Sequence, residues 1–230
     1  RNDCTAKQGA VRIMPMMVQT AERRVLLNGV TWETYSRLVK ECQENSGTRL
    51  TYDRGSLEIM TPSFQHESYK EVLARLFESL ADARCIDYLP GGSTTFRRED
   101  LKKGFEPDAC FYVRNVESIR GKTGIDLNTD PPPDLVNEID ITGSSLNKQD
   151  VFSAVGISEI WRTAENRVEI LRLESGSYFR NSESALLPGV TSSQLTAFLR
   201  ASQTMTRVEW VRFIRVGVCL MQVHYLPAFF

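Results

Sequence analysis

The amino-acid sequence predicts an α/β or α+β fold built around one β-sheet. Three observations predict this class: a long amphipathic helix follows an early hairpin, strand-like runs follow that helix, and a further helix lies between later strands. The chain has 230 residues, of which 41% are hydrophobic and 25% charged. This is the ordinary composition of a folded protein, and the length suffices for one substantial core.

The first third of the chain contains a short strand, a helix, a hairpin and a second helix. A strand near Arg24 precedes a helix that runs from an N-cap at Thr31 to about Cys42. A hairpin turns at Asp53-Arg54-Gly55, between runs that are rich in apolar residues. The helix over residues 65–83 has the clearest pattern, because its apolar residues form one continuous stripe: Tyr69, Val72, Leu73, Leu76, Phe77 and Leu80.

The remaining elements alternate strands with helices. We expect a long loop over 115–133, where prolines are frequent and apolar residues few. A helix over 146–155, capped by Ser144 or Ser145, stops at Gly156. A C-terminal helix begins at Ser192 and runs, with a break, to about Arg215. The predicted strands of this part are 85–89, 94–97, 109–113, 135–142, 157–163 and 167–175.

Charge and cysteine content exclude several kinds of partner and site. The net charge is −1 and the pI about 6.2, so no general basic field attracts nucleic acid. Local positive charge is available at Arg97, Arg98, Lys102 and Lys103. Five scattered cysteines without a CxxC pair, and only two histidines, argue against structural zinc. They are typical of reduced thiols, and we expect a cytoplasmic protein.

Both ends of the chain differ from the middle. Residues 1–16 have no periodicity and no secretory signal, so we expect an unstructured N-terminal extension. Residues 216–230 form an atypical apolar tail in which His224 is the only ionisable side chain. These 15 residues are shorter than the roughly 20 that span a bilayer, and we expect no membrane association. One domain is expected over 17–215.

Two Pro-Asp steps, each leading into a strand, are the strongest chemical signal. Pro107-Asp108 precedes one strand, and Pro133-Asp134 precedes another that carries Glu138. Glu138 and Asp140 share one face of that strand because side chains alternate. Carboxylates from neighbouring strands suit Mg²⁺, which needs oxygen ligands and relieves the repulsion between the acids.

Lys148 lies ten residues after Glu138, at the start of the next helix. Its ammonium could stabilise charge on an attacked phosphate. Spacing alone also fits a purely structural interpretation, in which Asp108 caps a turn, Glu138 is a surface charge on an edge strand and Lys148 is solvated. That alternative stays open at this point.

The same residues resemble a known family. The resemblance is carried by the run from Pro133 to Trp161, by RRVLLNGVTWETY, GTRLTYDRGSLEIMTPS and EPDACFYV, and by a His-Glu helix start. In these segments the chain resembles a large bacterial family of predicted restriction endonucleases in the PD-(D/E)xK superfamily, which was formerly a domain of unknown function. The resemblance covers about 18–198. Members usually begin near MVQT, here residues 17–20, and end in a charged helix, unlike this chain.

The resemblance implies a restriction-endonuclease-like core, in which a mixed central sheet is flanked by helices. It places the catalytic acids at Asp108 and Glu138, and Asp140 stands where the superfamily usually has its lysine. Lys148 then supplies the displaced positive charge. Glu67, at the start of the first core helix, could complete the metal site. His66 could contact a phosphate or a water, or be merely a helix N-terminal residue near solvent.

The expected activity is hydrolysis of DNA phosphodiester bonds with Mg²⁺ or Mn²⁺, held by Asp108, Glu138 and Glu67. A homodimer would allow both strands to be cut. One alternative is a catalytically silent nucleic-acid-binding or interaction protein that keeps the nuclease fold. Another is an acyl-transfer enzyme using Ser145 and Lys148 in an SxxK arrangement, although the SDN and KTG partner motifs are missing.

Overall fold

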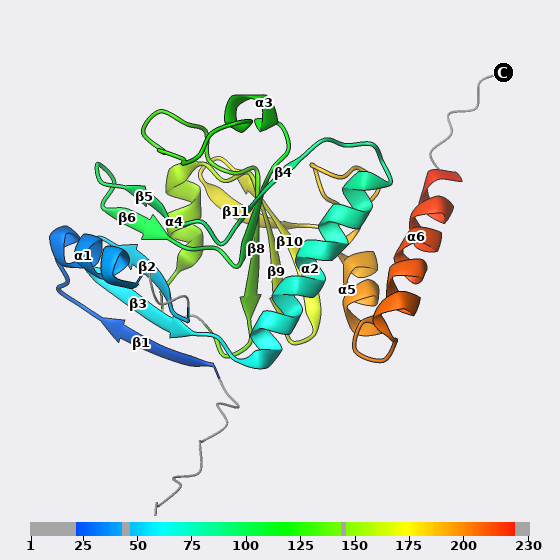
Figure 1. The fold of residues 1–230 in the computed structure, drawn as a ribbon, viewed down its shortest axis with the longest axis horizontal. Helices are drawn as coiled ribbons and strands as arrows, with labels where there is room; N and C mark the ends of the chain where they lie inside the picture. The colour runs from blue at the N-terminus through cyan, green and yellow to red at the C-terminus, as the bar shows by residue number, and fades with distance from the viewer. Residues whose placement is uncertain (1–21, 43–46, 144–145, 224–230) are drawn as a thin grey trace, which may run out of the picture.

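The computed structural model describes residues 22–42, 47–143 and 146–223, with side chains up to Gly217. Figure 1 shows the elements in chain order. The helices are α1 (Trp32–Cys42), α2 (Phe64–Asp82), α3 (Val116–Ile119), α4 (Lys148–Val155), α5 (Ser192–Ala201) and α6 (Arg207–Val223). The strands are β1 (Arg23–Leu27), β2 (Arg49–Asp53), β3 (Ser56–Thr61), β4 (Leu89–Gly92), β5 (Phe96–Arg98), β6 (Lys103–Phe105), β7 (Ala109–Tyr112), β8 (Leu135–Asp140), β9 (Glu159–Ala164), β10 (Arg167–Glu174) and β11 (Ser177–Asn181).

The strands form two sheets, so the expectation of one sheet was wrong. An antiparallel sheet has the order β1-β3-β2-β6-β5, with α1 packed against it through Trp32 and Tyr35. The second sheet has the order β11-β10-β9-β8-β7-β4. It is mixed, because β8 and β9 are parallel while its other pairs are antiparallel. A parallel pair needs a crossover connection, and α4 provides it.

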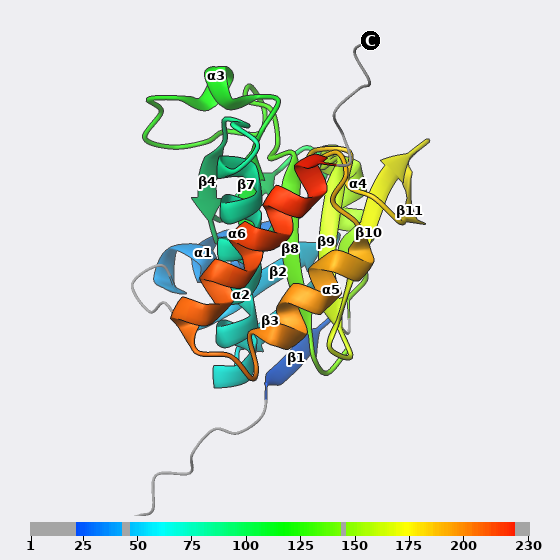
Figure 2. The ribbon, with the colours of Figure 1, turned by 90° about the vertical axis from the view of Figure 1, so that its right-hand side faces the viewer.

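Helices cover both faces of the mixed sheet, as expected. Alternate residues of β8 enter two separate cores: Leu135 and Ile139 pack with α2, α5 and α6, whereas Val136 packs with α4. Figure 2 shows α2, α5 and α6 lying together on one side of the sheet. Because side chains alternate along a strand, Glu138 and Asp140 lie on the same face as Val136, beside α4.

Local signals placed most helices correctly. Thr31 Oγ1 accepts a hydrogen bond from Thr34 N at 3.2 Å, which confirms the predicted N-cap of α1. At α4 the cap is Asn147, whose side chain accepts from Gln149 N, instead of Ser144 or Ser145, which lie outside the described residues. Gly156 ends α4 with a φ of +86°, a left-handed conformation that glycine adopts without strain.

Short strands were placed less well. The strand expected over 85–89 is displaced to β4, and β6 and β11 were missed. β6 has only three residues, all buried, and β11 is a largely exposed edge strand, so neither shows alternation of apolar and polar residues. The expected loop over 115–133 contains the one-turn helix α3.

The C-terminal helix has the expected break, after α5, but α6 continues beyond Arg215 to Val223. Residues 1–16 and 224–230 lie outside the described part, so the predicted extension and the end of the tail stay predictions. Within the described part of the chain, no helix has the length and apolar character needed to cross a bilayer.

Gly104 of β6 provides a test of the packing between α1 and the antiparallel sheet. A Cβ at this position would overlap the ring of Tyr35, which is fully buried and stacked on Tyr52 at 4.8 Å. We expect Gly104→Ala to lower the free energy of unfolding by about 1–3 kcal/mol, the usual cost of overpacking a core. Urea denaturation measures the free energy of unfolding of the variant. Gly124→Ala is the control, because no atom lies within 4 Å of a Cβ added at Gly124. Equal midpoints for the two variants would refute the expected clash.

Candidate active site

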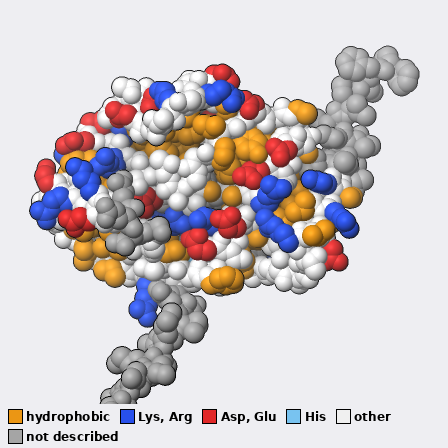
Figure 3. Space-filling model, viewed as in Figure 1, with side chains coloured by type: hydrophobic (Ala, Val, Ile, Leu, Met, Phe, Trp, Pro, Cys, Tyr) orange, Lys and Arg blue, Asp and Glu red, His pale blue; other side chains and the backbone are white. Residues whose placement is uncertain are grey.

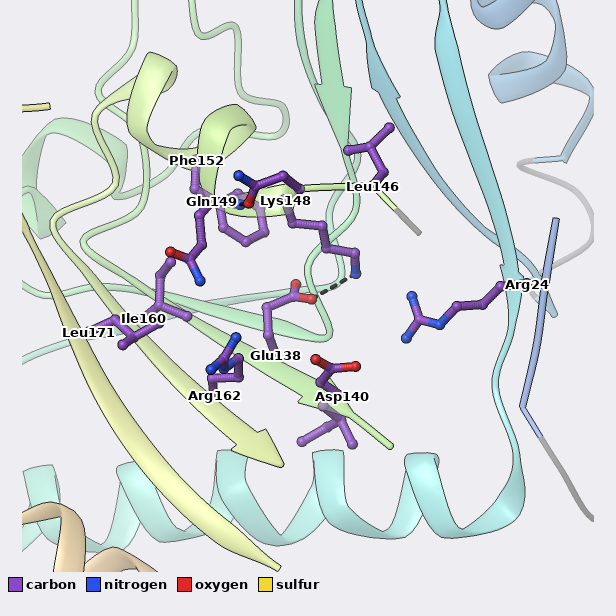
Figure 4. A pocket seen from close by; sticks show the side chains of 12 residues that line it. Arg24, Glu138, Asp140, Leu146, Lys148, Gln149, Phe152, Ile160, Arg162 and Leu171 are labelled. Atoms are coloured by element: carbon purple, nitrogen blue, oxygen red, sulfur yellow. Dashed lines mark hydrogen bonds and ion pairs between the residues drawn. The ribbon is translucent and has the colours of Figure 1, made fainter. Parts of the chain in front are cut away.

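Three elements bring Asp108, Glu138 and Lys148 together. Strands β7 and β8 pair with Ala109 opposite Asn137, so Asp108, one residue earlier, lies next to Glu138. Ile139 N donates to Asp108 Oδ2 at 2.7 Å, which ties the two segments. Lys148, the first residue of α4, donates from Nζ to Glu138 Oε2 at 2.7 Å (Figure 4). The sequence therefore predicted a real cluster, although the roles of its members stay predictions.

The cluster is buried, and burial sets its electrostatics. Asp108 is 1% exposed and Glu138 6%. Burial raises the pKa of Glu138 and the charge of Asp108 raises it further, although Lys148 partly opposes the shift. Burial also acts to raise the pKa of Asp108, but the hydrogen bond from His66 and the positive charges of His66, Lys148 and Arg49 together outweigh burial, and the pKa is lowered. The two acids therefore differ: positive charge from His66, Lys148 and Arg49 outweighs burial at Asp108, whereas Lys148 does not fully offset burial at Glu138.

His66 is fully buried, so its interpretation as a residue near solvent was wrong. Its Nδ1 lies 2.6 Å from Glu22 Oε2 and its Nε2 lies 2.7 Å from Asp108 Oδ1. Burial acts to lower the pKa of His66, but the hydrogen bonds to Asp108 and Glu22 raise it to about 9. At neutral pH the imidazolium therefore donates to both carboxylates. His66 orients Asp108 from behind the site.

Sequence reasoning missed the partners that hold this network. Glu22 accepts hydrogen bonds from Arg24 Nε at 2.7 Å and from Thr142 Oγ1 at 2.7 Å. Arg24, on β1, also donates to Glu58 of β3 at 2.8 Å. Glu22 lies just before the RRVLLNGVTWETY motif and Arg24 within it, but no spacing rule links either residue to His66. Their role follows only from the packing of the antiparallel sheet against the mixed one.

Glu67 and Asp140, the additional predicted site residues, lie in different surroundings. Glu67 pairs with Arg49 and with Lys70, each at 2.8 Å, and its side chain is 38% exposed. Arg49 Nε in turn lies 3.1 Å from Asp108 Oδ1, so Arg49 lies between Glu67 and the acid pair. Asp140 lines the cavity beside Glu138 and accepts from Gly143 N at 3.0 Å. A metal-binding role for Glu67 stays a prediction that this arrangement does not favour.

The donor set fits a magnesium ion held by two carboxylates. Over the described ranges, no group of three or more His, Cys, Asp or Glu side chains is placed to hold a metal. Magnesium, however, is commonly bound through one or two carboxylates with waters and substrate oxygens. Glu138 Oε1 is buried without a hydrogen-bond partner in the structure. A buried, unpartnered carboxylate oxygen beside a second carboxylate is a site that a divalent cation would stabilise.

A cavity of about 410 Å³ opens beside this cluster. Figure 4 shows Glu138, Asp140, Lys148 and two arginines, Arg24 and Arg162, around it, with Phe152, Ile160 and Leu171 on the left of the view. Arg24 comes from the antiparallel sheet and Arg162 from β9 of the mixed sheet. The cavity therefore has one charged side and one apolar side.

The basic cluster expected from sequence is largely neutralised. Arg98 pairs with Asp100 and Lys103 with Asp53, both at 2.7 Å, and Lys102 Nζ lies 3.6 Å from Glu99 Oε1. Figure 3 shows acidic and basic side chains interspersed across this face of the molecule. Non-specific attraction of a polyanion is therefore weak here, and recognition would depend on the cavity itself.

The network predicts a specific acid sensitivity of stability. Burial acts to raise the pKa of Glu22, but hydrogen bonds from His66, Thr142 and Arg24 lower it from 4.5 to about 2. A depressed folded-state pKa stabilises the fold above pH 4.5, and that stability is lost as the pH falls toward 2. The full effect is on the order of 3 kcal/mol. The free energy of unfolding of the wild type and of Glu22→Gln, measured from pH 5 to 2, checks this expectation. If the two proteins lose stability in parallel over that range, the expected role of Glu22 is contradicted.

A mixed sheet flanked by helices, with two acids on neighbouring strands and a lysine at the start of the crossover helix, defines the restriction-endonuclease-like class of nuclease folds. The chain belongs to the Uma2 family, described as "Putative restriction endonuclease", whose model matches residues 32–206. Among solved structures, the chain is similar to a "putative nuclease belonging to DUF820" from Anabaena variabilis, with 15% sequence identity and a TM-score of 0.46. The match covers 74% of this chain and 99% of the Anabaena chain. No curated protein sequence matches.

Proposed function

We propose that this protein is a metal-dependent endonuclease that hydrolyses phosphodiester bonds of DNA. The observation that carries the proposal is the convergence of Asp108, Glu138 and Lys148. Glu138 and Lys148 line a cavity, Asp108 lies buried directly behind them, and Glu138 Oε1 is buried and unpartnered. Membership of the Uma2 family supports the nuclease class. The metal and the DNA substrate are parts of the proposal that rest on the chemistry of these residues.

Each residue has a distinct task. Asp108 and Glu138 would hold the metal, which supplies positive charge to polarise a phosphodiester oxygen. Ile139 N and His66 Nε2 each donate to one Asp108 oxygen, and this fixes the carboxylate plane before substrate arrives. Lys148 has its ammonium at the cavity wall, where it stabilises the negative charge that builds on the phosphate. Arg24, held by Glu22 and Glu58, orders the opposite wall.

The proposal is tested by nicking of supercoiled plasmid. We expect conversion to open circles and linear DNA with Mg²⁺ or Mn²⁺, and no conversion with a chelator. A structured RNA in parallel reactions distinguishes DNA from RNA as substrate. Metal-independent nicking, or no cleavage of plasmid or of single-stranded DNA with either ion, would overturn the proposed activity.

One observation favours the silent nucleic-acid-binding alternative. Lys148 is tied to Glu138 in a buried ion pair at 2.7 Å, and this pair must loosen before Glu138 Oε2 can serve a metal. If this ion pair never opens, the protein keeps the nuclease fold and binds nucleic acid without cleaving it. Plasmid binding without nicking at any metal concentration would identify that case.

A further inference from the structure

The cavity beside the acid pair is divided into two chemically different sides. Its charged side carries Glu138, Asp140 and Lys148. Its other side is formed by Phe152, Ile160 and Leu171, which are 1–3% exposed and belong to the core beneath α4. A ligand that fills this space needs a charged part and a flat or compact apolar part joined to it.

One polar group stands over the apolar side. Gln149 lies in the first turn of α4, is half-buried and lines the cavity. Within the described part of the chain its side-chain amide has no hydrogen-bond partner, and Figure 4 shows it directed into the cavity beside Phe152. A free amide has both donors and an acceptor, the combination that reads the edge of a nucleobase.

From this arrangement we infer that the cavity takes the unstacked base of a nucleotide next to the scissile phosphate, so that the substrate class is single-stranded or locally unpaired nucleic acid. The inference rests on the proposed nuclease function and deepens it. The phosphate would lie against Lys148 and the acid pair, the base against Phe152, Ile160 and Leu171, and Gln149 would contact the base edge. In a paired duplex the bases are stacked and cannot enter such a pocket.

The size and charge of the site agree with this assignment. A cavity of about 410 Å³ falls in the range of pockets that bury a small organic ligand, and a double helix is far too large for it. Because the surface has no broad basic field, phosphate contacts alone would hold a duplex weakly. Burial of one base on an apolar floor adds affinity that is independent of the phosphates.

The test uses a fluorescent base analogue and does not need turnover. A short DNA strand that contains 2-aminopurine is titrated with the full chain in the presence of a chelator. The fluorescence of 2-aminopurine rises when the base is unstacked in a polar setting and changes when the base is buried. We expect the single strand to bind at least about tenfold more tightly than its duplex and to change emission on binding. Gln149→Leu should weaken single-strand binding by about tenfold, and Gln149→Trp, whose indole fills the cavity, should abolish the emission change.

Gln203→Leu is the control, because Gln203 is exposed between α5 and α6, outside the cavity. Its amide donates to Tyr69 OH at 3.0 Å, so this variant can lose some stability but no contact at the cavity. Gln203→Leu makes the same glutamine-to-leucine change and should bind the single strand like the wild type. Circular dichroism and urea unfolding confirm that the variants fold. Equal affinity for strand and duplex, or a Gln149→Leu protein indistinguishable from Gln203→Leu, overturns the base pocket.

The outcomes separate this inference from the proposed activity. Metal-dependent nicking of fully paired plasmid, with no preference for single strands and no emission change, would remove the base pocket and leave the nuclease. Emission changes and strand preference without cleavage by any metal-loaded sample would remove the nuclease and leave a base-binding pocket.

Discussion

Asp108→Asn should reduce metal-dependent cleavage at least about a thousandfold while the protein stays folded. The substitution keeps one oxygen, which can still accept from Ile139 N, but it turns an amide donor toward His66 Nε2 and removes the negative charge that would bind the metal. Cleavage is therefore compared at a temperature where the variant remains folded. Metal assistance contributes several kcal/mol to the transition state, and about 4 kcal/mol corresponds to a thousandfold in rate. We also expect Mg²⁺ to raise the melting temperature of the wild type and to leave that of Asp108→Asn unchanged. Plasmid nicking and thermal unfolding measure the two effects.

The other Pro-Asp step provides the control. Asp134 is also buried, but its Oδ2 accepts backbone hydrogen bonds from Val113 and Arg114 at 2.8 and 2.9 Å. Asp134 therefore performs the turn-capping role that sequence alone also allowed for Asp108. Asp134→Asn should lower stability, yet cleave at a temperature where it remains folded. The metal site is misassigned if Asp108→Asn cleaves as fast as the wild type, or if the two variants lose activity equally.

Lys148→Met should lower cleavage by about a hundredfold to a thousandfold and destabilise the protein. The change removes the positive charge beside the attacked phosphate, and losing one preorganised electrostatic contact has effects of this size. It also leaves both oxygens of buried Glu138 without a hydrogen-bond partner in the structure, since Oε1 already has none. Breaking one side of a buried ion pair typically costs about 3–5 kcal/mol.

A double variant separates the two effects. Lys148→Met with Glu138→Gln removes the unpaired charge, so stability should largely return, whereas cleavage should stay absent. Unfolding free energies of the wild type, both single variants and the double variant form a cycle that gives the coupling between the side chains. Two results would contradict this account: wild-type cleavage by Lys148→Met, or a double variant no more stable than Lys148→Met alone.

Signals that are local in sequence predicted much of this protein. The apolar stripe from Tyr69 to Leu80 predicted α2, and the Thr31 cap predicted the start of α1. The two Pro-Asp steps predicted the strands beside Asp108 and Glu138, and side-chain alternation follows directly from residue order. The antiparallel pairing of β7 with β8 then brings the two acids together. The order of motifs also predicted the family and the mixed sheet.

Other features depend on residues far apart in the chain. His66 meets Glu22 across 44 positions and Asp108 across 42, and no periodicity or spacing marks such a contact. The short strands β4, β6 and β11 exist because neighbouring strands offer hydrogen bonds, not because their own residues prefer a strand.

The sequence by itself therefore predicted the longer helices, the central strands, and the two acids and the lysine that the structure brings together. Only the tertiary structure decided that two sheets form, that His66 is buried between two carboxylates, and that Gln149 faces an apolar cavity. The reason is physical: local patterns reflect hydrogen bonding and burial within one element, whereas ion-pair networks and cavities arise where separate elements pack and share the same buried space.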